Sequence, residues 1–184
     1  QNIIKLIPEK TFVVSTTGFT SRELFEIRES LEMNHSRDFL TIGGMGFSSQ
    51  IAAGIALSKP NLKILCLDGD GSLLMHNGVM AVNASCSNLI HVVINNGVHD
   101  SVGGQSTYAQ KINLSQLARI FGYGYSITVD NIKDLNRSIK EALTKTKSYF
   151  IEVKSNKGSR SNLGRPNLPP IKIKELFMEG LKKN

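Results

Sequence analysis

Short apolar runs alternate along this chain with longer stretches in which apolar positions recur every three or four residues. The short runs indicate strands buried on both faces, and the longer stretches indicate amphipathic helices. Strands are predicted over residues 11–15, 64–68, 89–94, 126–129 and 149–153. Helices are predicted over residues 21–32, with Ser21 as the cap, 48–57, 72–88, 113–121 and 132–145. This rhythm predicts one α/β domain over residues 1–184, with a mainly parallel sheet between two layers of helices.

Two of the predicted strands end in polar turns. Residues 64–68 lead into Gly69-Asp70-Gly71-Ser72, and residues 89–94 lead into Asn95-Asn96-Gly97. If these strands are parallel neighbours, joined by a crossover over residues 72–88, Asp70 and Asn96 lie at the same edge of the sheet. The alternative interpretation is that each motif is only a turn.

The residue types in these turns suit a divalent cation that carries a diphosphate. Oxygens of Asp70 and Asn96, with the backbone carbonyl of Val98, would satisfy Mg²⁺, which prefers few protein ligands together with phosphate. Glycines allow the backbone to approach a ligand closely, and free N–H groups at the helix that follows, near Ser72, favour phosphate. The pattern therefore predicts a cofactor site with Asp70, Asn96 and Val98 as metal ligands.

The GDGS motif, with Asn96 placed 26 positions after Asp70, resembles the signature of the thiamine diphosphate-dependent 2-keto acid decarboxylases. Residues 69–78, 94–107 and 158–166 are similar to the members of this family that act on phosphonopyruvate, and sulfopyruvate decarboxylases are the nearest competitors. The resemblance implies a thiamine diphosphate-binding fold. It also implies Mg²⁺-dependent decarboxylation of 3-phosphonopyruvate to phosphonoacetaldehyde and CO₂, a step of phosphonate biosynthesis.

The resemblance also implies how the cofactor is held. Met45 matches the apolar wedge beneath the cofactor, and Gly43 matches the carbonyl that binds the pyrimidine amino group; the alternative is a plain strand-to-helix turn with Met45 in the core. Thr17 and Gly18 match a segment near the diphosphate and the pyrimidine. The expected cofactor-binding residues are Thr17, Gly18, Gly43, Gly44, Met45, Gly69, Asp70, Gly71, Ser72, Asn96 and Val98.

Residues 96–112 form a predicted loop of a length that usually serves function in a compact domain. His99 could relay a proton, because the imidazole pKa lies near neutrality, or could be an ordinary loop histidine. Ser101 and Gln105 could donate hydrogen bonds to a carboxylate or phosphonate. Arg160 and Arg165 could each bind a phosphonate through two donors, and Arg160 is the preferred candidate. The catalytic candidates are His99, Ser101, Gln105 and Arg160.

Thiamine catalysis requires a glutamate beside the pyrimidine ring, which this family takes from a different domain. The glutamates 23, 26, 29 and 32 are interpreted as solvated positions of one helix. We therefore expect that the pyrimidine-binding domain or alpha subunit is absent from this chain, and that activity requires it in a homo- or hetero-oligomer. Two alternatives stay open: the beta subunit of a sulfopyruvate decarboxylase, and a non-catalytic nucleotide-binding or interaction module.

The formal charge of +7 does not indicate a nucleic-acid partner. Residues 154–184 hold eight cations and two acids, a net +6, without the aromatic residues and motifs of a nucleic-acid platform, and are interpreted as mostly solvated surface. Cys66 and Cys86 lack metal or redox spacing, so reduced thiols in a cytoplasmic protein are expected. No apolar stretch is long enough to span a membrane, and a sequence that starts at Gln1 says little about a leader.

Overall fold

A computed structural model describes residues 1–183, and its centre is a sheet in which all six strands are parallel. The strand order is β2-β1-β3-β4-β6-β5. The chain thus moves outward from β1 to β2 and then returns to the other side of β1 with β3, so the connections of β1 and β3 leave in opposite directions. The strands are β1 (Phe12–Ser15), β2 (Asp38–Leu40), β3 (Ile64–Gly69), β4 (Leu89–Asn95), β5 (Tyr125–Val129) and β6 (Tyr149–Lys154).

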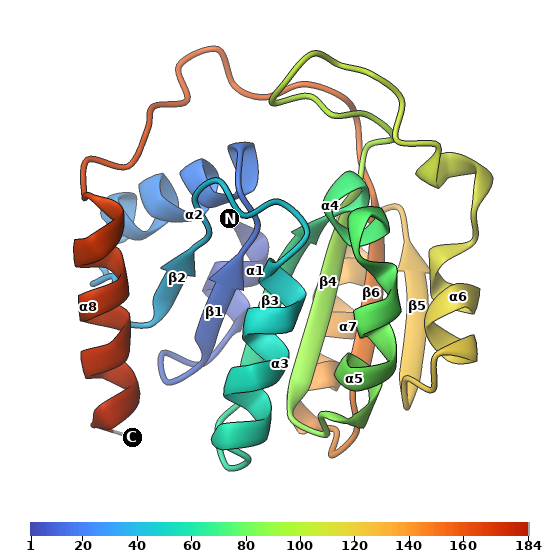
Figure 1. Cartoon of the computed structure of the whole chain (residues 1–184), viewed down its shortest axis with the longest axis horizontal. Coiled ribbons are helices and arrows are strands. Elements are labelled where there is room, and N and C mark those ends of the chain that lie inside the picture. The colour runs from blue at the N-terminus through green and yellow to red at the C-terminus, as the bar shows by residue number, and fades with distance from the viewer. Residues whose placement is uncertain (184) are drawn as a thin grey trace.

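Helices cover both faces of the sheet, which confirms the predicted three-layer α/β/α fold (Figure 1). One face carries α1 (Asn2–Leu6), α2 (Phe19–Ser30) and α7 (Ile132–Thr144). The other carries α3 (Ser48–Ser58), α4 (Asp70–Met75), α5 (Met80–Ser85) and α6 (Leu114–Ile120), and α8 (Pro170–Lys182) lies beside β2. None of the helices described over residues 1–183 has the length and apolar content needed to cross a membrane.

The alternation of side chains along β3 shows how the two layers are held. Leu65 and Leu67 pack with residues of α1, α2 and α7, whereas Ile64 and Cys66 point to the opposite face and pack with residues of α3 and α8. Successive strand residues point to opposite faces, so a strand that is apolar at every position must be covered on both sides. The continuous apolar runs in the sequence therefore correspond to fully buried strands.

The structure corrects two predicted helices. The crossover over residues 72–88 is not one helix, because α4 and α5 are separated by the short 3-10 helix η1 (Asn77–Val79). Ser21 does not cap α2, which begins at Phe19 after the N-cap Gly18. The Ser21 hydroxyl instead donates to the backbone oxygen of Thr16 at 2.6 Å, and so ties the helix to the end of β1.

Helices α1 and α8 were not predicted. The cations of the basic carboxyl-terminal segment lie at the surface, as expected, with Lys154 half-buried and the others exposed, but the segment also contains α8, which has a buried apolar face. Ile173, Phe177 and Leu181 are buried at a spacing of four residues, which places them on one face of α8. The Phe177 ring packs edge-on against Phe12 of β1, with centroids 5.6 Å apart. The segment is therefore a basic amphipathic helix whose apolar face completes the core.

A buried ion pair joins α2 to the edge strand β2. Arg28 donates from Nε to Oδ2 of Asp38 at 2.8 Å and from a terminal nitrogen to Oδ1 at 2.9 Å, and both side chains are almost fully buried. Burial raises the pKa of the Asp38 carboxyl, although the facing guanidinium acts in the opposite direction. The edge strand thus depends on a charge pair as well as on apolar contacts.

Replacing Asp38 with alanine should leave the Arg28 guanidinium buried without its partner. We expect the free energy of unfolding to fall by about 3–5 kcal/mol. Glu175→Ala, which breaks the exposed pair between Glu175 and Lys172 on α8, is the control and should cost less than about 1 kcal/mol. Urea unfolding measures both variants, and equal losses would contradict the role given to the buried pair.

Candidate functional site

The turns after β1, β3 and β4 meet at the carboxyl edge of the sheet and enclose a pocket of about 90 Å³. In a doubly wound sheet, ligands bind at the edge where the strand order reverses, and here that point lies between β1 and β3. The predicted residues that line this pocket are Thr17, Met45, Gly69, Asp70, Gly71, Ser72, Asn96, Val98, His99 and Ser101.

Asp70 is held so that one carboxylate oxygen remains free. Its side chain is 3% exposed, and Oδ2 accepts hydrogen bonds from the Thr107 hydroxyl and, at 3.2 Å, from the Gly97 amide. Within residues 1–183, no group donates a hydrogen bond to Oδ1. Asp70 can therefore keep its orientation and still offer an oxygen to a cation.

The two asparagines after β4 have different roles. Asn95 is buried, and its Nδ2 donates to Oε1 of Glu152 on β6 at 2.7 Å, so it fixes the strand end. Asn96 lines the pocket, where its Oδ1 accepts from the Val98 amide at 3.1 Å and its Nδ2 donates to Asp100 at 2.7 Å. Only the second asparagine of the pair faces the pocket.

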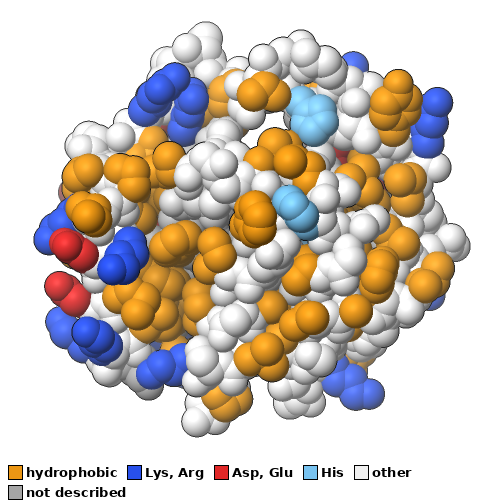
Figure 2. All heavy atoms as spheres, viewed as in Figure 1, with side chains coloured by type: hydrophobic (Ala, Val, Ile, Leu, Met, Phe, Trp, Pro, Cys, Tyr) orange, Lys and Arg blue, Asp and Glu red, His pale blue; other side chains and the backbone are white. Residues whose placement is uncertain are grey.

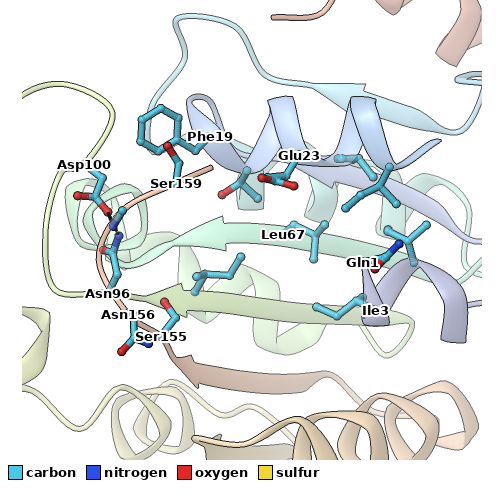
Figure 3. A pocket seen from close by; sticks show the side chains of 16 residues that line it. Gln1, Ile3, Phe19, Glu23, Leu67, Asn96, Asp100, Ser155, Asn156 and Ser159 are labelled. Atoms are coloured by element: carbon cyan, nitrogen blue, oxygen red, sulfur yellow. Dashed lines mark hydrogen bonds between the residues drawn. The ribbon is translucent and has the colours of Figure 1, made fainter. Parts of the chain in front are cut away.

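Asp100 was not predicted as a site residue, although it follows Asn96 by only four positions. Its Oδ2 accepts from Asn96 Nδ2 and also from the Gly158 amide at 2.7 Å. Figure 3 shows Asn96 and Asp100 pointing toward each other at one end of a neighbouring cavity of about 230 Å³, which extends between α2 and the sheet. Asp100 thus joins the loop after β4 to the loop after β6. Thr107, whose hydroxyl donates a hydrogen bond to Asp70, was also not predicted as a site residue.

The Ser72 hydroxyl connects three turns. It accepts from the Thr16 hydroxyl and from the Gly46 amide, both at 3.0 Å. The glycine run that carries Met45 is thereby fixed against the turn that carries Asp70. Met45 is half-buried and lies at the pocket wall, as a residue beneath a bound ligand would.

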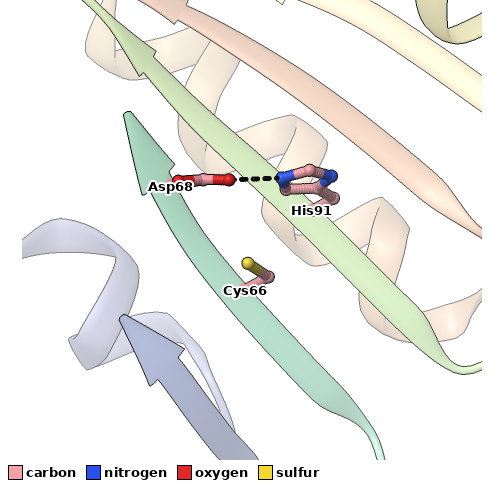
Figure 4. Close-up of side chains that lie close together, drawn as sticks. All are labelled: Cys66, Asp68 and His91. Atoms are coloured by element: carbon pink, nitrogen blue, oxygen red, sulfur yellow. Dashed lines mark hydrogen bonds and ion pairs between the residues drawn. The ribbon is translucent and has the colours of Figure 1, made fainter. Parts of the chain in front are cut away.

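Beneath the pocket, Asp68 anchors the end of β3 (Figure 4). Its Oδ1 accepts from the Ser48 hydroxyl at 3.0 Å and the Gly69 amide at 2.9 Å, and its Oδ2 lies 3.4 Å from His91 Nε2. Burial by itself raises the pKa of Asp68, but the hydrogen bond and charge of His91, with bonds from Ser72 and Gly69, lower that pKa below its usual range. The carboxylate is therefore kept charged inside the core.

Cys66, Asp68 and His91 place possible metal-ligating atoms within 4.8 Å of one another. The two ring nitrogens of His91 already face Asp68 and the Tyr123 hydroxyl, the latter at 2.8 Å. Burial raises the pKa of the Cys66 thiol well above its usual value, so the thiolate that would bind a metal is disfavoured. We interpret the cluster as hydrogen-bonded support for the pocket.

The structure leaves some of the predicted residues outside this pocket. Gly18 and Gly43 line a larger neighbouring cavity, and Gly44 lines neither. Gln105 is exposed, and its backbone oxygen accepts from the His99 amide at 2.8 Å.

Arg160 is not brought to the pocket, because two glutamates of α2 hold it. Its Nε donates to Glu23 at 2.7 Å, and a terminal nitrogen lies 2.5 Å from Glu26. These carboxylates raise the pKa of the Arg160 guanidinium, whereas Arg160 lowers the pKa of Glu26. Glu23 and Glu26 are therefore not simply solvated positions of a helix, as the sequence suggested.

The donor set fits a hard cation with a diphosphate. Asp70 Oδ1, Asn96 Oδ1 and the Val98 carbonyl are oxygen donors, as Mg²⁺ requires. Gly71 lies so close to the neighbouring loop that a Cβ placed there would be 2.6 Å from His99 Nδ1. Only glycine, which has no side chain, leaves room here for a ligand to approach the backbone of the turn.

The fold, with an oxygen-rich pocket at the strand-order reversal, suits a domain that binds a diphosphate cofactor, and a family model identifies its class. Residues 17–153 match the family model "Thiamine pyrophosphate enzyme, C-terminal TPP binding domain". The chain belongs to this family. The benzoylformate decarboxylase of Polynucleobacter necessarius has the same fold, with a TM-score of 0.73 at 18% identity over 86% of this chain and 32% of that one.

Curated relatives include decarboxylases that are named for two different substrates. The chain is 34% identical to the phosphonopyruvate decarboxylase of Streptomyces hygroscopicus over 97% of its own length and 44% of that protein. It is 31% identical to the sulfopyruvate decarboxylase subunit beta of Methanocaldococcus jannaschii over 100% of its own length and 95% of that subunit. The chain therefore spans less than half the length of the phosphonopyruvate decarboxylases that it matches.

Substituting Gly71 with alanine should displace His99, because the new Cβ would overlap its ring and approach Thr107 Cγ2 at 3.0 Å. We expect the free energy of unfolding to fall by about 1–3 kcal/mol, as for other overpacked sites. Gly78→Ala is the matched control, since nothing lies within 4 Å of a Cβ there. Urea unfolding and the NMR signal of the His99 ring report the effects, and an unmoved signal in Gly71→Ala would refute the contact.

Proposed function

We propose that this chain is the diphosphate- and Mg²⁺-binding part of a thiamine diphosphate-dependent decarboxylase that converts 3-phosphonopyruvate to phosphonoacetaldehyde and CO₂. The observation that carries the proposal is that Asp70 and Asn96, at the ends of neighbouring strands, face one pocket at the strand-order reversal. The similarity to phosphonopyruvate decarboxylases supports the choice of substrate. The reaction would belong to phosphonate biosynthesis in the cytoplasm.

In this proposal each part of the pocket has a task. Asp70, Asn96 and the Val98 carbonyl bind Mg²⁺, and the turn at Gly71 and Ser72 binds the diphosphate. Met45, Gly43, Gly44, Thr17 and Gly18 orient the rest of the cofactor. When bound, thiamine diphosphate supplies the electron sink that decarboxylation of a 2-keto acid requires.

The loop after β4 supplies the groups nearest the reacting carbons. His99 lies over the Gly71 turn and can hold or deliver a proton. Ser101 lines both cavities and can donate a hydrogen bond to the substrate carboxylate. Gln105 stays a proposed substrate contact that would require the loop to turn inward.

A partner that binds the pyrimidine would complete the site and supply the catalytic glutamate. Apolar side chains are exposed at the larger cavity beside the pocket, among them Ile42 at 54% and Val102 at 75%. Figure 2 shows apolar side chains spread over one face of the molecule. Exposed apolar patches of this kind are typical of interaction surfaces. The relatives that are named as beta subunits support a homo- or hetero-oligomer with a partner domain or subunit.

Sulfopyruvate is the second candidate substrate. The similarity to sulfopyruvate decarboxylase beta subunits extends over 95–96% of their length in two archaeal relatives. A sulfonate and a phosphonate are both tetrahedral oxyanions, so the same pocket could bind either.

The metal role of Asp70 predicts loss of Mg²⁺-dependent cofactor binding in Asp70→Asn, which keeps the shape but removes the charge. In the enzyme assembled with its pyrimidine-binding partner, thiamine diphosphate should bind about 10- to 100-fold more weakly. Asp130→Asn, at an exposed position before α7, is the control. Calorimetry with Mg²⁺ or with a chelator measures the difference. A wild-type enzyme indifferent to Mg²⁺ would favour a non-catalytic nucleotide-binding or interaction module.

Because the proposal places the activating glutamate on the partner, this chain holds only part of the active site. We therefore predict that the 184-residue chain alone does not release CO₂ from any 2-keto acid. Addition of the partner should start decarboxylation. Assays with phosphonopyruvate, sulfopyruvate and pyruvate then rank the substrates by kcat/KM. Turnover by the chain alone would overturn the need for a partner, and a preference for sulfopyruvate would select the second candidate.

A further inference from the structure

A cavity of about 550 Å³ opens beside the candidate cofactor pocket. The two share Thr17, Met45 and Ser101, so a molecule in one lies next to a molecule in the other. The remaining wall is formed by the ends of β1 and β2, the start of α2, and the loop that leads into α8. Its size and position leave room for a small substrate beside the cofactor.

Two guanidinium groups line this cavity, those of Arg22 on α2 and Arg165 on the loop before α8. No aspartate or glutamate is among its lining residues within the described chain. The guanidinium carbon of Arg22 lies 5.5 Å from the centroid of the Phe19 ring, but within residues 1–183 neither guanidinium group has an ion pair or a hydrogen bond. In Figure 2, basic side chains lie next to apolar ones near the loop that leads into α8. The cavity therefore has two uncompensated positive charges.

Two acids that follow Arg22 on α2 are held by another cation. Glu23 and Glu26 follow Arg22 on α2, and both bind Arg160. Glu26 also accepts a hydrogen bond from the Gly164 amide at 2.6 Å, one residue before Arg165. Arg160 thus has two effects: it pairs with both acids that follow Arg22 on α2, and it joins the loop that carries Arg165 to α2.

We propose that Arg22 and Arg165 bind the second anionic group of the substrate, a tetrahedral oxyanion, which places the keto carbon at the shared wall with the cofactor pocket. This assignment rests on the proposed function. A phosphonate matches two cations better than a sulfonate, because it can carry a second negative charge. Guanidinium groups bind such oxyanions with paired, directed hydrogen bonds. Arg160, the preferred candidate from the sequence, is a positioning residue in this arrangement.

The kinetic test uses the enzyme assembled with its partner and Arg22→Gln and Arg165→Gln. Each should lower kcat/KM for phosphonopyruvate by about 10- to 100-fold, the range for one charged hydrogen bond, and should change kcat/KM for pyruvate far less. Arg165→Lys, which keeps the charge, should restore part of the loss. Arg137→Gln, at an exposed position on α7, is the control and should behave as wild type. Equal losses for both substrates would overturn the assignment.

A binding test does not depend on turnover. Methylphosphonate and methanesulfonate are titrated into the 184-residue chain, and NMR follows the side-chain Nε–Hε signals of its arginines. We expect methylphosphonate to shift the signals of Arg22 and Arg165, to shift those of Arg137 and Arg160 little, and to bind more tightly than methanesulfonate. Shifts of equal size at Arg137 would indicate non-specific attraction and refute the site.

The two tests separate this inference from the proposed function. If thiamine diphosphate fails to bind while methylphosphonate still shifts Arg22 and Arg165, the proposed function is wrong and the oxyanion site stands. If thiamine diphosphate binds in a Mg²⁺-dependent manner and the two arginine signals do not move, the proposed function stands and this inference is wrong. Tighter binding of methanesulfonate would assign the site to a sulfonate and overturn the preference for phosphonate.

Discussion

Parallel strands place all their carboxyl ends at one edge, and in this sheet the connections of β1 and β3 leave that edge in opposite directions. No connection then covers the ends of these two strands, so the turns that follow them face each other across open space. Thr17 after β1, Asp70 after β3 and Asn96 after β4 reach one pocket for this reason. The position of the candidate site, and of the cavity beside it, follows from this reversal.

The polar groups at these uncovered strand ends do not all find hydrogen-bond partners in helices. Other groups in the core must therefore hold the strand ends in position. This support comes from two buried carboxylates, Asp68 near the end of β3 and Glu152 on β6, beside β4. Asp68 holds the end of β3 through Ser48, Gly69 and His91, and Glu152 holds the end of β4 through Asn95. Buried charges are costly unless they are fully hydrogen-bonded. In this protein the two buried carboxylates hold in position the turns that follow the strands.

The sequence was informative where local pattern determines structure. Apolar runs predicted five of the strands, and the turns at their ends predicted that Asp70 and Asn96 would meet. It was less informative where residues far apart in the sequence determine the position of a side chain. Arg160 pairs with glutamates more than 130 positions away, and no local sequence signal indicates this pairing. The spacing of Ile173, Phe177 and Leu181 could have revealed α8, but the charges around them dominated the interpretation.

The Asp100 carboxylate accepts hydrogen bonds from the loops after β4 and after β6 with the same oxygen. In thermodynamic terms, the two loops share part of their entropy loss on ordering. Fixing the loop after β4 places the Asp100 acceptor, and fixing the loop after β6 places the Gly158 donor. A ligand that orders the first loop therefore lowers the entropy that a second ligand must lose at the other. Occupation of the pocket at Asn96 and occupation of the cavity at Arg165 are thereby expected to be positively cooperative.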